Sequence, residues 1–223
     1  MTQELWTAVD QYITQTLLPS DPVLEAVLHA SAEAGLPSIQ VSPPQGKLLH
    51  LLARSINARK ILEIGTLGAY STIWMARALP AGGGLLTLEA DAKHAEVSGA
   101  NIARAGLKGM VEQRFGPALD TLPQIAAEGR GPFDLIFIDA NKSTMAEYFE
   151  WALKLAHPGS MIIADNVIRD GAVIDAASKD ADVQGVRRFN ERLAAEPRIS
   201  ATEIQTVGGK GYDGFALVLV LSV

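Results

Sequence analysis

The chain has 223 residues, a formal net charge of −6 and no cysteine, so disulfides and thiolate chemistry are excluded. Its length fits one α/β domain with a full hydrophobic core. The acidic balance disfavours a large nucleic-acid surface, which would need clustered Lys and Arg, although a local basic patch stays possible. Because no stretch is long enough to span a membrane and Met1–Glu4 lacks a signal-peptide layout, we expect a soluble, cytoplasmic protein.

The first forty residues predict a helical extension of the single domain over residues 1–223. Apolar residues recur at helical spacing from Leu5 to Leu17. Asp21-Pro22 then has the form of a helix N-cap with proline in the first turn, and Gly35 ends that second helix. A third start signal, Ser42–Gln45, combines a serine cap, proline and the glutamine of a capping box.

A strand, a tight turn and a helix are predicted next. The apolar run Ile61–Ile64 contains Glu63 and leads into Gly65–Gly68, and a helical pattern follows through Leu79. In open α/β sheets such a turn is the place where nucleotides bind. We expect Glu63 to face the ligand, where a carboxylate suits an amino group or a sulfonium. A buried structural glutamate is the alternative, and the G-x-G-x-x-G spacing of dinucleotide binding is missing.

A second acid follows the next apolar run. Leu85–Leu88 ends in Glu89, which is spaced from Gly65 much as the ribose-binding acid of nucleotide-binding βαβ units is spaced. A carboxylate there can accept hydrogen bonds from both ribose hydroxyls, whereas the alternative is a solvent-facing acid. Met110–Phe115 predicts a third strand, and Gly116–Ala118 follows it.

Two further strands predict a metal site. Phe133–Ile138 is followed by Asp139, and Met161–Ala164 is followed by Asp165-Asn166. A helical pattern between them implies a right-handed crossover that sets the two strands parallel and adjacent, so their carboxyl ends converge. Two carboxylates and an amide suit Mg²⁺ first, with Mn²⁺ or Ca²⁺ as alternatives. Helix capping or a turn would explain either aspartate alone.

Lys142 lies just before Thr144, which is a candidate helix N-cap. A cation gains nothing from the positive end of a helix dipole, so helix stability does not explain its position. Beside a divalent ion the amine would lose its proton more easily, as a general base requires. A solvated loop lysine is the alternative.

The C-terminal part predicts a substrate rim and a hairpin. Residues 169–182 are polar and loop-like, and a helix follows through Leu193. Ile199–Val207 and Phe215–Leu221 then predict an antiparallel hairpin joined by the glycine-rich segment Gly208–Gly214.

These segments resemble the metal-dependent O-methyltransferases of the catechol and caffeoyl-CoA type. The resemblance rests on Glu63–Thr66 with Tyr70-Ser71, on Asp139-x-x-Lys142 and on Ala164–Ile168, and it extends from about Val41 to the C-terminus. One departure is Ala69, where the family usually has glycine. The resemblance implies a three-layer Rossmann-like α/β fold with a seven-stranded, mostly parallel sheet and an antiparallel C-terminal hairpin.

The resemblance also implies functional residues and a methyl donor, S-adenosylmethionine. It assigns Lys142 as the catalytic base and a divalent cation to Asp139, Asp165 and Asn166. The residues expected at S-adenosylmethionine are Val41, Glu63, Gly65, Ser71, Glu89, Ala118 and Asp139.

The predicted activity is methylation of a vicinal-dihydroxy aromatic small molecule of catechol, hydroxycinnamoyl or flavonoid type. One alternative is a tRNA hydroxyuridine O-methyltransferase of the same fold. A nicotinamide-dependent oxidoreductase is a further alternative, although the glycine spacing disfavours it. Relatives commonly pair, and the apolar stripe around Trp6 lies outside the sheet motif, so we expect a homodimer.

Overall fold

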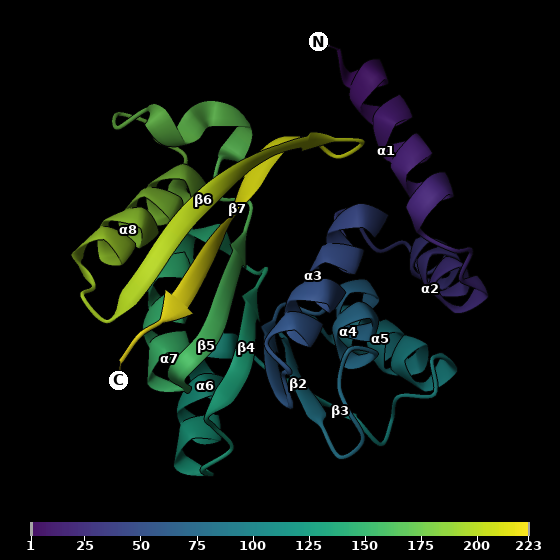
Figure 1. The fold of residues 1–223 in the computed structure, drawn as a ribbon, viewed down its shortest axis with the longest axis horizontal. Helices are drawn as coiled ribbons and strands as arrows, with labels where there is room; N and C mark the ends of the chain where they lie inside the picture. Colours follow the sequence, from purple (N-terminus) through teal and green to yellow (C-terminus); the bar gives the residue numbers. More distant parts are fainter. Residues whose placement is uncertain (1, 223) are drawn as a thin grey trace.

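A seven-stranded sheet forms the centre of the computed structural model, which describes residues 2–222 (Figure 1). The strand order is β3-β2-β1-β4-β5-β7-β6. Strands β1 to β5 pair in parallel, and β7 pairs antiparallel with both β5 and β6. The strands are β1 Lys60–Ile64, β2 Gly84–Glu89, β3 Val111–Phe115, β4 Phe133–Ile138, β5 Ala156–Asp165, β6 Ile199–Gly208 and β7 Gly211–Val220. The predicted fold class and terminal hairpin are confirmed.

Helices cover both faces of the sheet. One core cluster joins the sheet to α6, α7 and α8, with Phe149 and Phe189 fully buried in it. The other joins the opposite face to α2, α3, α4 and α5, with Leu49 and Ile73 at its centre. The helices are α1 Gln3–Leu17, α2 Pro22–Glu33, α3 Pro43–Ser55, α4 Tyr70–Ala76, α5 Ala92–Arg104, α6 Ala118–Ala127, α7 Met145–Lys154 and α8 Ala181–Ala195, with 3-10 helices η1 Lys142–Thr144 and η2 Arg169–Ile174.

Helix starts follow the capping signals. The Asp21 carboxylate accepts hydrogen bonds from the backbone N–H groups of Val23 and Leu24, both at 3.1 Å. The Ser42 hydroxyl accepts one from the Gln45 N–H at 3.3 Å. Gln45 of α3 and Asp165 at the end of β5 line the same cavity.

Helix α1 lies apart from the sheet, beside the tip of the β6–β7 hairpin (Figure 1). The Gln3 side chain donates to the Gly208 carbonyl at 2.9 Å, and the Gly209 N–H donates to Asp10 at 2.7 Å. No residue of α1 is buried. Within residues 2–222, no helix has both the length and the apolar character that crossing a membrane requires.

The hairpin differs from its prediction in the length of its connection. The strands continue to Gly208 and restart at Gly211, so only Gly209-Lys210 form the turn. Gly214 lies inside β7. A Cβ at this position would overlap the Ile204 carbonyl oxygen and crowd the Ile168 side chain. Close packing rather than a turn therefore explains that glycine. Strand β5 also starts earlier than predicted, at Ala156 rather than Met161.

Candidate active site at the carboxyl edge of the sheet

The glycine turn after β1 is held in a conformation that few sequences tolerate. Gly65 has φ +99°, and a Cβ there would overlap the Asp139 carbonyl oxygen at the end of β4. Leu67 and Ala69 also have positive φ, at 51° and 65°. Ala69 thus adopts the left-handed conformation that favours glycine, the residue that the family usually has here. The Ala69 side chain is also fully buried. Such strain persists only where the surrounding structure enforces it.

Glu89 holds this turn in place. One carboxylate oxygen accepts the N–H groups of Thr66 at 3.2 Å and Leu67 at 2.8 Å. The other accepts those of Ala90 and Asp91, both at 2.9 Å. The residue lines the cavity described below, as predicted, but four backbone amides already occupy its oxygens. It therefore organises the turn in addition to any role toward a ribose.

Glu63 does not face the cavity, so that expectation is wrong in this structure. Its side chain is fully buried, and its oxygens accept the hydroxyls of Ser71 at 2.6 Å, Thr72 at 2.5 Å and Thr87 at 2.7 Å. Burial raises the pKa of Glu63 to about 7. The open alternative of a buried structural glutamate describes it better, although hydroxyls rather than a lysine surround it. Through Ser71 it reaches the cavity wall indirectly.

A cavity of about 510 Å³ opens over the carboxyl ends of β1, β2 and β4. Most of the predicted cofactor residues line it, namely Val41, Gly65, Ser71, Glu89, Ala118 and Asp139. Lys142 and Asn166 line it too. The wall also includes Ile39, Leu67, Tyr70, His94 and Tyr148, which were not predicted at the cofactor site. Leu67 belongs to the glycine turn and Tyr70 to the Tyr70-Ser71 motif, whereas the other three carry no motif and reach the cavity only through the folding of the chain.

Lys142 and Asp139 form an ion pair at the rim of this cavity. The lysine lies in η1, and its Nζ donates to an Asp139 carboxylate oxygen at 2.7 Å. Only 8% of the Lys142 side chain is exposed. It is therefore not the solvated loop lysine that was the alternative.

Asp165 lies at the end of the neighbouring strand. Ile138 of β4 is aligned with Ala164 of β5, so Asp139 and Asp165 follow paired residues. Burial, together with the negative charge of Asp139, raises the pKa of Asp165 to about 7. The two carboxylates therefore repel each other across a site in which Lys142 is the nearby cation.

A second cavity, of about 310 Å³, meets the first at this point. Asp165 and Asn166 line it, and Asn166 lines both cavities. Asn166 has φ +59°, a conformation that asparagine tolerates better than most residues. Within residues 2–222, no group of three or more His, Cys, Asp or Glu side chains forms a metal site. The predicted set has two carboxylates and an amide.

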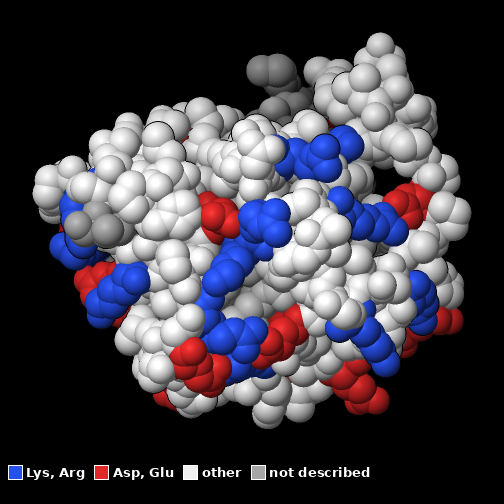
Figure 2. All heavy atoms as spheres, turned by 60° about the horizontal axis from the view of Figure 1, so that its bottom comes forward, with Lys and Arg blue, Asp and Glu red and all other residues white. Residues whose placement is uncertain are grey.

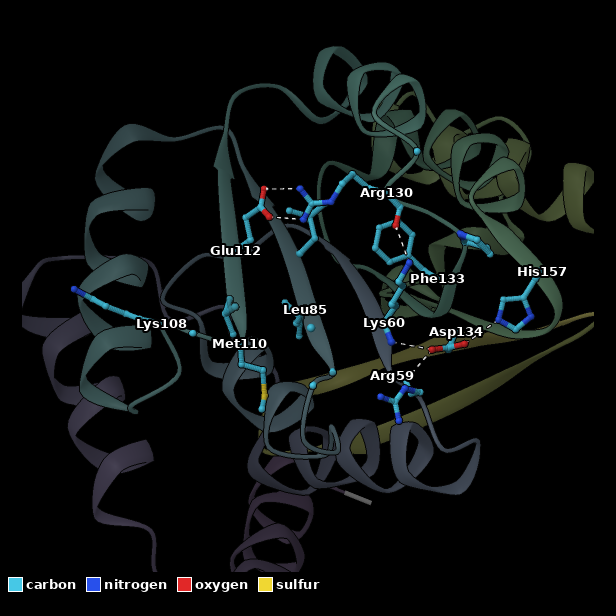
Figure 3. Close-up of a pocket in the computed structure, with 18 residues that line it drawn as sticks. Arg59, Lys60, Leu85, Lys108, Met110, Glu112, Arg130, Phe133, Asp134 and His157 are labelled. Atoms are coloured by element: carbon cyan, nitrogen blue, oxygen red, sulfur yellow. Dashed lines mark hydrogen bonds and ion pairs between the residues drawn. The ribbon is translucent and has the colours of Figure 1, made fainter.

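The largest cavity, about 810 Å³, lies at the opposite edge of the sheet (Figure 3). Both of its acidic side chains have partners. Arg130 points to Glu112 and forms an ion pair with it, and Asp134 faces His157, with 2.9 Å between the carboxylate and Nε2. The other Asp134 oxygen accepts the N–H groups of Arg59 and Lys60. These contacts describe a structural network.

The surface at that edge mixes both signs of charge. Over the face shown in Figure 2, Asp and Glu side chains lie among those of Lys and Arg, which also form a continuous run near the centre. Arg114 pairs with Glu128, and Arg130 pairs with Glu112. These ion pairs neutralise part of the basic charge that an RNA backbone would need.

Comparisons with known proteins identify the family. The model of a family described as O-methyltransferase matches residues 15–220. A catechol O-methyltransferase from Niastella koreensis is 55% identical over 220 residues, which are 99% of this chain and 100% of that protein. An O-methyltransferase from Bacillus cereus, solved in complex with SAH, has a TM-score of 0.97 and 58% identity, covering 98% of this chain and 100% of that one.

A third relative is also close to this chain along its whole length. An O-methyltransferase from Streptomyces achromogenes involved in tomaymycin synthesis, solved in complex with SAM, has a TM-score of 0.96 and 53% identity, covering 100% of both chains. The chain therefore belongs to the O-methyltransferase family, which confirms the prediction of an S-adenosylmethionine-dependent O-methyltransferase.

Proposed function

We propose that the chain transfers the methyl group of S-adenosylmethionine to one hydroxyl of a vicinal-dihydroxy aromatic small molecule, in a divalent-cation-dependent reaction. The observation that carries this proposal is the Asp139–Lys142 ion pair beside Asp165 and Asn166, at the point where two cavities meet. One cavity has the glycine turn and would hold the methyl donor. The other would hold the methyl acceptor.

The first cavity suits S-adenosylmethionine. It is lined by the Gly65 turn, the Ser71 hydroxyl and Glu89, and its volume of about 510 Å³ falls in the range of small-molecule pockets. The relatives from Bacillus cereus and Streptomyces achromogenes were solved with SAH and SAM. Asp139 lines the same cavity, so the donor and the acid pair would be neighbours.

The residues around Asp165 fit a divalent cation. Asp139, Asp165 and Asn166 offer hard oxygen ligands, and the raised pKa of Asp165 shows that burial and its neighbour disfavour its charge. Lys142 alone contributes one positive charge against two carboxylates. Bound there, Mg²⁺, Mn²⁺ or Ca²⁺ would lower the pKa of an acceptor hydroxyl and favour the neutral form of the Lys142 amine.

Lys142 is the proposed general base. It lines the first cavity, which meets the second at Asn166, and it is shielded from water, so a neutral amine there can take a proton from an acceptor hydroxyl. The phenolate oxygen then forms a bond to the methyl carbon as the carbon–sulfur bond of the donor breaks. Because the walls hold donor and acceptor in separate cavities, the chain also supplies orientation.

A radiolabelled methyl-transfer screen tests this function. Catechols, hydroxycinnamates and undermodified tRNA are offered with S-adenosylmethionine, with and without EDTA. We expect labelled catechol-type products that disappear in EDTA and return with Mg²⁺ or Mn²⁺. Labelling of tRNA alone would favour the hydroxyuridine alternative. Undiminished labelling after exhaustive metal removal would contradict the proposed dependence on a divalent cation. The family assignment leaves no support for a nicotinamide-dependent oxidoreductase.

We also infer a homodimer formed through α1. Leu5, Val9, Tyr12 and Leu17 are exposed on this helix, although they are apolar or aromatic. A second copy covering them would bury that surface in a twofold interface. Sedimentation at micromolar concentration should give a dimer for the wild type and a monomer for Val9→Asp, with Glu191→Gln on α8 as the control. A wild-type monomer would contradict the inference.

A further inference from the structure

The second cavity is walled by segments from both ends of the chain. It extends from Asp165 and Asn166 between the start of α3, η2 and the hairpin tip, and Asp10 of α1 lines it as well. Under the proposed function this cavity holds the part of the methyl acceptor that lies beyond its two hydroxyls. Its walls then meet whatever substituent the aromatic ring carries.

The walls carry an excess of negative charge. Besides Asp165, the lining includes Asp10, Asp170 and Asp213. One Asp213 oxygen accepts the N–H groups of Ile168 at 2.9 Å and Arg169 at 3.1 Å. Asp10 accepts the Gly209 N–H. The partners of both carboxylates are backbone amides, and within residues 2–222 no basic side chain forms an ion pair with either.

The counter-charge is weak. Among the described residues that line the cavity, Lys210 is the one basic side chain. Its Nζ donates to the Ser38 carbonyl at 2.7 Å, outside the lining, and burial lowers the pKa of its ammonium. The ammonium thus ties the hairpin tip to the segment before α3 and is directed away from an acceptor substituent.

Asp170 is the acid left open to a ligand. It is exposed, and nothing within residues 2–222 forms an ion pair or hydrogen bond with its side chain. The adjacent Arg169 lies 3.6 Å from Asp182 instead. Asp170 has φ +54°, which fixes it in a left-handed conformation at the rim. A neighbouring negative charge on a ligand would meet this carboxylate without an intervening cation.

We propose that Asp170, supported by Asp10, selects methyl acceptors by charge. The favoured acceptors are vicinal-dihydroxy benzenes with a neutral or ammonium-bearing substituent. Those with a carboxylate or a phosphate, including free hydroxycinnamates and acyl-coenzyme A thioesters, are disfavoured by like-charge repulsion. This selectivity rests on the proposed function, because it assumes that the acceptor occupies the second cavity.

Three catechols of nearly equal size test the selectivity. Dopamine, 4-ethylcatechol and 3-(3,4-dihydroxyphenyl)propanoate share the ring and differ in the charge of the substituent. At low ionic strength we expect kcat/KM to fall in that order. Dopamine should exceed the propanoate by at least about fivefold, the effect of one unit-charge interaction near 4 Å in water, and added salt should narrow the gap.

Isosteric variants assign the effect to its residues. Asp170→Asn should lower the ratio of kcat/KM for dopamine to kcat/KM for the propanoate several-fold. Adding Asp10→Asn, in a double variant, should lower this ratio further. The amide oxygen of asparagine can still accept the Gly209 N–H, so the change removes the charge and keeps the contact. Glu191→Gln, which removes one exposed charge on α8, should leave the ratio unchanged. In Asp170→Asn and in the double variant, kcat/KM for neutral 4-ethylcatechol should change less than kcat/KM for the two charged catechols, which separates charge selection from a damaged site.

Two results would overturn the inference alone. Equal or better turnover of the propanoate by the wild type would show that the wall charges do not select. If the ratio of kcat/KM for dopamine to kcat/KM for the propanoate is unchanged in Asp170→Asn and in the double variant, other residues select the acceptor. Absence of methylation for all three catechols would instead contradict the proposed function, and the charge selection with it.

Discussion

The two edges of the sheet use charged residues in opposite ways. At the amino edge, Asp134 is matched by two backbone amides and His157, and Glu112 by Arg130. At the carboxyl edge, Asp165 is buried beside a second carboxylate, and its pKa is raised to about 7. The larger cavity lies at the amino edge. A buried acid beside a second carboxylate therefore indicates the proposed reactive site better than cavity size does.

Replacing the lysine at each edge gives the largest expected contrast. Lys142→Ala should slow the chemical step by about 10²- to 10⁴-fold, because the general base is lost. S-Adenosylmethionine affinity should remain, and raising the pH should recover part of the rate as the acceptor ionises unaided. Lys60→Ala, at the amino edge, is the control and should keep its kcat. Single-turnover kinetics that show equal rates for the two variants would remove Lys142 from the mechanism.

The acids of the two edges should differ in cofactor binding. Glu89→Ala should weaken S-adenosylmethionine binding by about 2 to 4 kcal/mol, because hydrogen bonds to a charged acceptor are lost and the glycine turn loses its two amide contacts with Glu89. Glu112→Ala should leave the affinity unchanged. Calorimetric titration measures both, with circular dichroism to check the fold. Wild-type affinity in Glu89→Ala would place this acid outside the cofactor site.

Glu63 predicts a pH dependence of stability at the carboxyl edge. Its pKa is 4.5 when unperturbed and about 7 in the folded chain. Between these values the folded state holds a proton that the unfolded state has lost, so the free energy of unfolding falls as pH rises. The slope is about 1.4 kcal/mol per pH unit, giving about 3 kcal/mol in all, and the contribution is constant above pH 7.

Urea denaturation of the wild type and Glu63→Gln between pH 5 and pH 8 measures this contribution. The free energy of unfolding of the wild type should fall relative to that of the variant across this range, because glutamine does not titrate. Asp165 titrates in both proteins, so its contribution cancels in the difference. Two parallel stability profiles would contradict the raised pKa.

The amino edge should affect stability and leave activity intact. Asp134→Ala leaves two backbone amides and His157 without their acceptor, which should lower the free energy of unfolding by about 1 to 3 kcal/mol. Its kcat and KM, measured well below the unfolding temperature, should match the wild type. A loss of turnover in the folded variant would mean that the two edges are coupled.

Much of the carboxyl edge was predictable because strand ends carry local signals. A buried apolar run followed by Asp139, and another followed by Asp165-Asn166, place two acids at one edge once the strands are parallel. The glycine turn likewise predicted the place of the first cavity, which Gly65 lines. Glu63 was misplaced because β1 is buried on both faces, so alternation along the strand does not distinguish the ligand side from the core.

Long-range contacts account for what the sequence did not predict. Asp10 reaches the hairpin tip about 200 residues later in the chain, and Lys210 reaches Ser38. Neither contact has a local pattern, because each depends on how α1 and the hairpin pack. The four amides around Glu89 were also missed, since a motif does not show the direction of backbone N–H groups in a strained turn. The second cavity is bounded by the segments that these contacts of Asp10 and Lys210 join.

A Mn²⁺ titration followed by electron paramagnetic resonance tests the central claim most directly, namely that Asp139, Asp165 and Asn166 hold a divalent cation. The wild type should bind one Mn²⁺ per chain, and Mg²⁺ should compete for it. Asp165→Ala should lose at least about tenfold in Mn²⁺ affinity. The S-adenosylmethionine affinities of Asp165→Ala and of the amino-edge variant Asp134→Ala should stay unchanged. Equal Mn²⁺ binding by wild type and Asp165→Ala, or no binding by the wild type, would contradict the account.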